Sequence, residues 1–225
     1  MTREQEKMKQ TPLYLILLLT ACALTIGCEH VAKIPDFSLL NRPDYSPPDE
    51  RYDLSVALVQ NAEFKSTRYQ RAGFIYILEI GPQLSKNTYE LASLLFRKVT
   101  TVESIDAIDG GADAYLTPRV VDIERAEGGK RGDSTRITLV LEWRLEDADQ
   151  QLVWIETVKG VGIGTAPFSD ADDEKLIESL LTQLFDQSYR KMLTSPEIEK
   201  FAEYVHKPLT SEASIQKKSS LDITK

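Results

Sequence analysis

The chain has 225 residues, of which 42% are hydrophobic and 28% are charged, which suits one ordinary domain with appendages. Its formal charge of −8 argues against a nucleic-acid partner, and against adhesion to anionic lipid through a basic face. The two cysteines, Cys22 and Cys28, both lie near the N-terminus, so a disulfide framework is excluded as the source of the fold's stability.

The N-terminal segment has the organisation of an export signal. Residues 1–10 are polar and carry three basic side chains, and an apolar run follows from Leu13 to Gly27. As a helix, this run of about 15 residues would span ~22 Å, which is short of the ~30 Å apolar core of a bilayer. The pattern therefore favours the apolar region of a cleaved signal, and an uncleaved membrane anchor is the alternative.

The end of this run, Leu19-Thr20-Ala21-Cys22, resembles the lipobox of bacterial lipoproteins: a branched aliphatic residue, two small residues and a cysteine. The resemblance implies that the Cys22 thiol receives a diacylglyceryl group, that residues 1–21 are removed as a signal peptide, and that the new amine is acylated. Two or three acyl chains anchor a protein firmly, whereas one binds only marginally. Cys28, preceded by Thr25-Ile26-Gly27, is the alternative lipidation site.

The residue after the lipidated cysteine bears on the destination. Ala23 follows Cys22 and Glu29 follows Cys28, so neither site has an adjacent aspartate. By resemblance to enterobacterial sorting, this lack of a retention signal predicts a lipid anchor in the outer membrane, with the domain facing the periplasm.

Residues 22–50 are predicted to be a proline-rich tether, because Pro35, Pro43, Pro47 and Pro48 favour extended backbone over helix. Four apolar residues in this segment are expected to pack on the domain or on a partner: Ile34, Phe37, Leu39 and Leu40. The domain itself is predicted to occupy residues 51–205, and the polar residues 206–225 are predicted to be a disordered tail.

The first half of the domain alternates strand and helix signals. Strands are expected at 54–59 and 74–80, the second ended by Gly81-Pro82, with a polar loop at 61–72 between them. A helix is predicted at 85–98, with Arg97 and Lys98 at its C-terminal end. A short strand at 100–102 and a strand at 114–125 follow, and Pro118 indicates that the latter lies at an edge or contains a bulge.

The second half has clearer periodicity. Apolar residues alternate with polar ones from Ile137 to Leu145, and a second strand from Leu152 to Ile163 follows a polar turn, which predicts a long antiparallel hairpin. Three glycines near its far end, Gly160, Gly162 and Gly164, allow twist or close backbone approach. A long amphipathic helix is predicted up to Leu193, and a short helix after the cap Ser195.

These elements predict an α+β fold: a mainly antiparallel sheet with a long hairpin, one face packed by two amphipathic helices. The element order loosely resembles the YajG-type uncharacterised periplasmic lipoproteins and, more distantly, the lipopolysaccharide-assembly lipoprotein. The resemblance covers about residues 52–205 and has no diagnostic motif, so it implies no functional residue.

No catalytic or metal-binding constellation stands out. The two histidines, His30 and His206, lie outside the predicted domain, which argues against a zinc site and against a Ser-His-Asp mechanism. The acidic run at 170–174 lacks the oxygen spacing of a calcium loop and suits a helix N-terminus instead. The Arg-Gly-Asp triplet at 131–133 is interpreted as part of a flexible glycine-rich loop. We therefore expect no metal and no cofactor, although a carboxylate-pair hydrolase stays open.

The aromatic side chains on predicted strands are interpreted as core or rim residues, with a ligand platform as the alternative; they are Trp143, Trp154, Tyr76 and Tyr115. The leading hypothesis is a lipid-anchored periplasmic lipoprotein that is not an enzyme and acts as a scaffold or assembly factor in an envelope process, through an envelope protein partner. The alternative is a transport accessory that binds lipid or glycolipid between sheet and helices.

Overall fold

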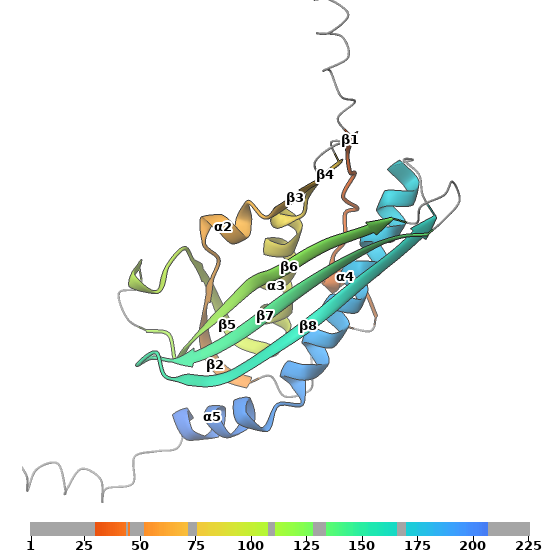
Figure 1. Ribbon diagram of the computed structural model, residues 1–225. Coiled ribbons are helices and arrows are strands. Elements are labelled where there is room, and N and C mark those ends of the chain that lie inside the picture. Colours follow the sequence, from red (N-terminus) through yellow and green to blue (C-terminus); the bar gives the residue numbers. More distant parts are fainter. Residues whose placement is uncertain are drawn as a thin grey trace, which may run out of the picture.

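The largest element of the computed structural model is a five-stranded sheet with the order β5-β2-β6-β7-β8 (Figure 1). The structure describes residues 30–43, 45, 52–71, 76–107, 111–127, 134–165 and 170–206. The strands are β2 (Tyr52–Val59), β5 (Phe96–Val102), β6 (Ala114–Glu127), β7 (Ser134–Asp147) and β8 (Leu152–Thr165). β2 pairs in parallel with β5 and β6, whereas β6, β7 and β8 are antiparallel.

The predicted hairpin is confirmed as β7 and β8, which pair from Ser134↔Thr165 to Glu146↔Leu152. The alternation decides which face is buried: Ile137, Leu139, Leu141, Trp143 and Leu145 are at most 1% exposed. At the turn, the Asp147 carboxylate accepts hydrogen bonds from the backbone N–H groups of Asp149 and Gln151. This strand pair therefore has one face that requires a covering layer.

Three helices pack on the sheet: α3 (Gly81–Leu95), α4 (Asp170–Leu193) and α5 (Pro196–His206). In Figure 1, α3 and α4 lie behind the sheet, with α4 along β8, and α5 lies near the ends of β2 and β8. The α+β prediction is confirmed, with α5 as a third helix in the layer. Ser195 caps α5 as predicted, because its Oγ accepts the backbone N–H of Ile198 at 3.2 Å.

The glycines of β8 allow α4 to lie against the strand. A Cβ atom at Gly162 would lie 2.2 Å from the Leu176 carbonyl oxygen, and one at Gly160 would lie 2.5 Å from that of Leu180. Any side chain here would therefore meet the helix backbone. The close approach expected of these glycines is confirmed.

A second, smaller sheet has the order β1-β4-β3 and consists of β1 (His30–Val31), β4 (Tyr76–Glu79) and β3 (Arg68–Arg71). One short α-helix, α2 (Ala62–Lys65), precedes β3, and two 3₁₀ turns lie at Leu39–Asn41 and Ile105–Ala107. The prediction of a loop over 61–72 was therefore wrong. Asn61 starts α2 by accepting the Phe64 backbone N–H at 2.8 Å, and β3 pairs with β4.

The predicted bounds of the first long helix were also wrong. Helix α3 begins at Gly81, where any Cβ would lie 2.3 Å from the Lys65 carbonyl oxygen, and Pro82 fits the first helical turn. It ends at Leu95, so Arg97 and Lys98 belong to β5 rather than to a helix end. Parallel pairing with β2 explains the change, because strand hydrogen bonds satisfy this backbone.

Pro118 lies where the sequence places an edge or a bulge. β2 pairs with β6 only from Ala114 to Leu116, and the register between β6 and β7 shifts between Val120 and Asp122. On its other edge, Pro118 pairs with Trp143 of β7. Both expected features, a free edge on one side and a bulge, are therefore present next to the proline among the described residues.

Candidate functional site

The predicted lipidation site lies outside the described residues. This holds for the lipobox residues Leu19, Thr20 and Ala21, for Cys22 and for its alternative Cys28, and likewise for the triplet at 131–133 and for residues 207–225. The structural description begins at His30, eight positions after Cys22 (30 − 22). The first described segment is therefore the part of the domain nearest to the predicted anchor.

That first segment packs on the domain. We call residues 30–43 and 45 the strap; in Figure 1 it begins at β1 and runs beside α4. Phe37 and Leu39 are 3% and 0% exposed, so the expectation that they pack on the domain is confirmed. Ile34 is half-buried against the core, whereas Leu40 is 60% exposed and points away from it.

Helix α3 binds the strap through a row of polar side chains at Gln83, Asn87 and Glu90, spaced four and three residues apart and hence on one face. The Glu90 carboxylate accepts the Leu39 backbone N–H at 2.8 Å and the Ser38 hydroxyl at 3.0 Å. Gln83 and Asn87 both donate to the Phe37 carbonyl oxygen. Side chains of α3 thus form the hydrogen bonds with the strap backbone that a neighbouring strand would otherwise form.

Helix α4 also binds the strap. Arg42 forms an ion pair with Glu178 at 2.6 Å, Lys33 forms one with Glu174 at 2.5 Å, and the Tyr45 hydroxyl donates to Asp186. Single exposed ion pairs contribute about 0–1 kcal/mol each, so these contacts orient the strap more than they stabilise it.

One ion pair between the strap and α3 shifts the pKa values of both of its partners. Lys86 Nζ lies 2.7 Å from Asp36 Oδ1. The hydrogen bond from Lys86, together with its positive charge, lowers the pKa of Asp36 below its ordinary value, and the same hydrogen bond raises the pKa of Lys86. The strap therefore contains a carboxylate whose charge is favoured by its docked position.

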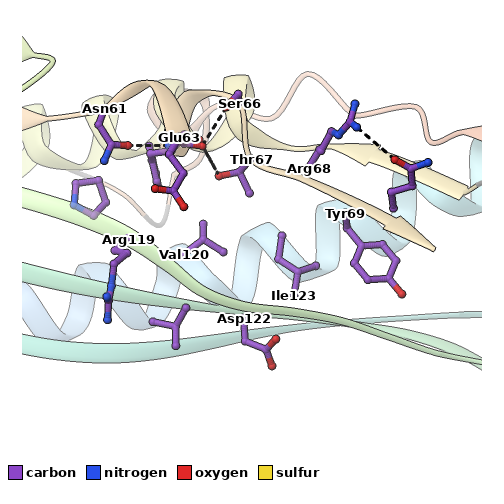
Figure 2. Close-up of a pocket in the computed structure, with 14 residues that line it drawn as sticks. Asn61, Glu63, Ser66, Thr67, Arg68, Tyr69, Arg119, Val120, Asp122 and Ile123 are labelled. Atoms are coloured by element: carbon purple, nitrogen blue, oxygen red, sulfur yellow. Dashed lines mark hydrogen bonds between the residues drawn. The ribbon is translucent and has the colours of Figure 1, made fainter. Parts of the chain in front are cut away.

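A cavity of about 750 Å³ lies between the α2–β3 segment and β6 (Figure 2). Its walls are residues 61–70, apart from Ala62 and Lys65, and residues 118–123 of β6. In Figure 2, Val120 and Ile123 point from β6 toward the α2–β3 segment, and Tyr69 points from β3 toward β6. This volume falls within the ~300–1,000 Å³ of typical ligand pockets.

The strand aromatics belong mainly to the core. Trp143 is fully buried and donates from Nε1 to the Ser188 hydroxyl at 2.8 Å, and Trp154 is 7% exposed. Tyr76 is buried beneath the Arg125 guanidinium, which lies 3.5 Å from its ring centroid. The core interpretation of these three is confirmed, while Tyr115 is half-buried on β6.

The acidic run at 170–174 forms the first turn of α4, as predicted. Asp173 is buried, and the Tyr76 hydroxyl donates to its Oδ1 at 3.5 Å. Within the described ranges no group of three or more His, Cys, Asp or Glu side chains is placed to hold a metal ion. In the same part of the chain, no helix is both long and apolar enough to cross a bilayer.

Sequence reasoning missed two features, the three polar side chains of α3 that bind the strap and the cavity between β3 and β6. Asn87 and Glu90 are 0% and 7% exposed although they are polar, which marks them as partners of the strap. Their positions on the buried side of the helix were the available signal. The cavity had none, because it joins segments about fifty residues apart.

Neither a family model nor a curated protein sequence matches the chain. Among solved structures, it is similar to a protein of the DUF330 family from Xanthomonas campestris, with 13% identity over 72% of this chain and 98% of that one, at a TM-score of 0.41. A minor lipoprotein from Acinetobacter baumannii matches at 13% identity over 61% of this chain and 91% of that one, with a TM-score of 0.37. A PelC dodecamer from Paraburkholderia phytofirmans matches at 20% identity over 62% and 94%, with a TM-score of 0.34. At these values the similarities carry no argument about function.

Proposed function

We propose that this chain is a lipid-anchored periplasmic lipoprotein that acts without catalysis, as a scaffold or assembly factor in a bacterial envelope process. The observation that carries the proposal is the lipobox-like run Leu19-Thr20-Ala21-Cys22 at the end of an apolar segment too short to span a bilayer. The anchor is in the outer membrane in this proposal, since neither cysteine is followed by aspartate.

The strap adds a geometric argument for the scaffold role. Because the strap is docked on α3 and α4, only the positions between Cys22 and His30 separate the anchor from the folded body. Eight residue steps reach at most ~29 Å, and a lipid on Cys28 would leave two steps, or ~7 Å. A body held this close to the membrane suits a partner that lies at the same surface.

The packing between sheet and helices supports a scaffold over a lipid carrier. The interior positions there are filled by apolar side chains with 0% exposure, among them Trp143, Leu180 and Phe185. A lipid or glycolipid at this place would have to displace these close-packed side chains.

Incorporation of radiolabelled palmitate tests the anchor. We expect the label to be lost in Cys22→Ser and retained in the matched variant Cys28→Ser, with the native protein in the outer-membrane fraction. Loss of label only in Cys28→Ser would move the site to Cys28. Full labelling of a chain that carries both substitutions, or no labelling of the native chain, would refute the anchor.

Cross-linking in the envelope followed by mass spectrometry tests the scaffold role. We expect a discrete protein partner to be recovered with the native chain. Recovery of a stoichiometric lipid in the purified protein, without any protein partner, would refute the scaffold and favour the transport accessory.

A further inference from the structure

The strands that pair with β6 differ along its length. Its residues Ala114–Leu116 pair with β2 on one edge, and β7 pairs with its other edge throughout. Beyond Leu116, residues 118–123 have no strand partner on the β2 side among the described residues. A free strand edge presents backbone N–H and C=O groups at the spacing that another extended chain matches.

A second free edge borders the same space. In the described part of the chain, β3 pairs with β4 on one side only and is the outer strand of the small sheet. Residues of β3 and residues 118–123 of β6 both line the cavity of about 750 Å³, and Figure 2 shows β3 passing above β6 with their side chains between them. Two strand edges therefore share one cavity, and a chain placed there lies next to both.

The floor of the cavity, on β6, is apolar. Val120 and Ile123 form it, and Tyr69 faces them from β3; all three are half-buried and pack against the core. An extended chain alternates its side chains, so one set of them would lie on this floor. Six residues of strand cover ~20 Å, which sets the length of such a segment.

The cavity lining carries charges of both signs, with Glu63 and Asp122 acidic and Arg68 and Arg119 basic. Glu63 lies in the first turn of α2, is exposed, and extends toward β6 in Figure 2. Among the described residues it has no ion-pair partner, whereas Arg119 on β6 is paired with Glu142 at 3.2 Å. A basic side chain on an occupant complements this carboxylate.

We propose that this cavity docks a short extended polypeptide segment of a partner protein, which pairs as a strand with the 118–123 edge of β6. Its apolar side chains lie on Val120, Ile123 and Tyr69, and a basic side chain lies beside Glu63. Pro118 has no N–H to donate, and the bulge between Val120 and Asp122 interrupts the ladder, so the edge selects a short segment and resists indiscriminate strand pairing.

This inference deepens the scaffold function, on which it rests for the role of the partner. The docking chemistry itself depends only on β3, β6 and α2. Failure of palmitate labelling would leave it intact, and failure of peptide binding would leave the anchor intact.

The test uses the full chain in mild detergent and a pooled library of acetylated heptapeptides. The second, fourth and sixth positions carry Val, Ile, Phe or Tyr, and the others carry Lys, Thr or Ser. The peptides that remain bound to the chain are synthesised again with a fluorescent label, and their affinity is measured by fluorescence anisotropy. Hydrogen exchange then locates the bound peptide. We expect a Kd below about 1 mM. We also expect slower hydrogen exchange of the backbone amides in residues 68–71 and 118–123 when the peptide is bound.

Three controls make the result specific. Glu63→Lys is expected to weaken binding of Lys-containing peptides by about tenfold or more. Glu124→Lys, an exposed carboxylate of β6 outside the cavity lining, is expected to leave binding nearly unchanged. Peptides N-methylated at the alternate residues whose N–H groups face β6 cannot donate to the edge and are expected to lose binding. The proposal would be overturned if the methylated peptides bound as tightly as the unmethylated ones, or if the peptide slowed exchange in α3 and α4 instead. It would also be overturned if the chain retained no peptide.

Discussion

The Glu90 carboxylate accepts the backbone N–H of Leu39 at 2.8 Å, across 51 positions of sequence. Glu90 is 7% exposed, and Leu39 is fully buried. One side chain of a helix thus satisfies the backbone of the segment closest to the predicted anchor. The attachment of the strap depends on this relationship, and it can be measured.

Replacing Glu90 tests the polar part of the attachment. Glu90→Ala leaves the buried N–H of Leu39 without its acceptor, so we expect a loss of about 1–3 kcal/mol in the free energy of unfolding, and faster amide exchange in residues 37–43. Glu203→Ala, at an exposed position on α5, is the control and should change neither quantity. Unchanged exchange in the strap of Glu90→Ala would contradict this account.

Two adjacent leucines test the apolar part. Leu39→Ala creates a cavity under the strap and should cost about 2–5 kcal/mol in urea unfolding. Leu40→Ala, at a side chain that is 60% exposed, should stay within about 0.5 kcal/mol of the native chain. Equal effects of the two substitutions would show that the strap is not packed as described.

The glycines of β8 provide a graded series. Alanine at Gly162 would place Cβ 2.2 Å from a backbone oxygen of α4, whereas alanine at Gly164 would meet the flexible end of Leu176 at 3.1 Å. We expect Gly162→Ala to lose about 1–3 kcal/mol or more from overpacking, and Gly164→Ala to lose clearly less. Thermal or urea unfolding gives the order, and a reversed order would refute the close seating of α4.

The Asp36–Lys86 pair predicts a pH dependence. The pKa of Asp36 in the folded chain lies below its ordinary value of 3.8, because the hydrogen bond and the charge of Lys86 favour the carboxylate. The contribution of the pair is therefore present above pH 3.8 and is lost as the pH falls through the lower folded value. Amide exchange of the strap should rise over this acidic range in the native chain, and Asp36→Asn should remove that rise.

Asp106→Asn is the matched control, because Asp106 is an exposed aspartate outside the strap. Its acid profile should follow that of the native chain. A strap whose exchange does not respond to Asp36→Asn would show that the ion pair is without consequence for docking.

The local sequence pattern was sufficient to predict the elements whose buried residues recur at one regular spacing. The hairpin from Ser134 to Thr165 and the helix from Asp170 to Leu193 were predicted because each buries one face, and periods of 2 and 3.6 residues separate them. The cap at Ser195 followed from local chemistry as well.

Local patterning failed where a distant partner decides the structure. Arg97 and Lys98 suit the end of a helix, yet parallel pairing with β2 makes them strand residues. The docking of the strap depends on Glu90 and on α4, and the cavity depends on β3 approaching β6. Of these contacts, only those of α3 leave a signal in the sequence, namely the spacing of Gln83, Asn87 and Glu90 on one helix face.

The contacts of the strap also set an order of assembly. The hairpin of β7 and β8 joins neighbouring segments, so it can form as soon as those segments are available. Arg42 instead binds Glu178, 136 positions away, and Tyr45 binds Asp186, 141 positions away. The described segment that is synthesised first therefore completes its contacts only after α4 exists. Until α4 is available, the strap has only its contacts to α3, in which Glu90 binds Leu39 and Gln83 binds Phe37.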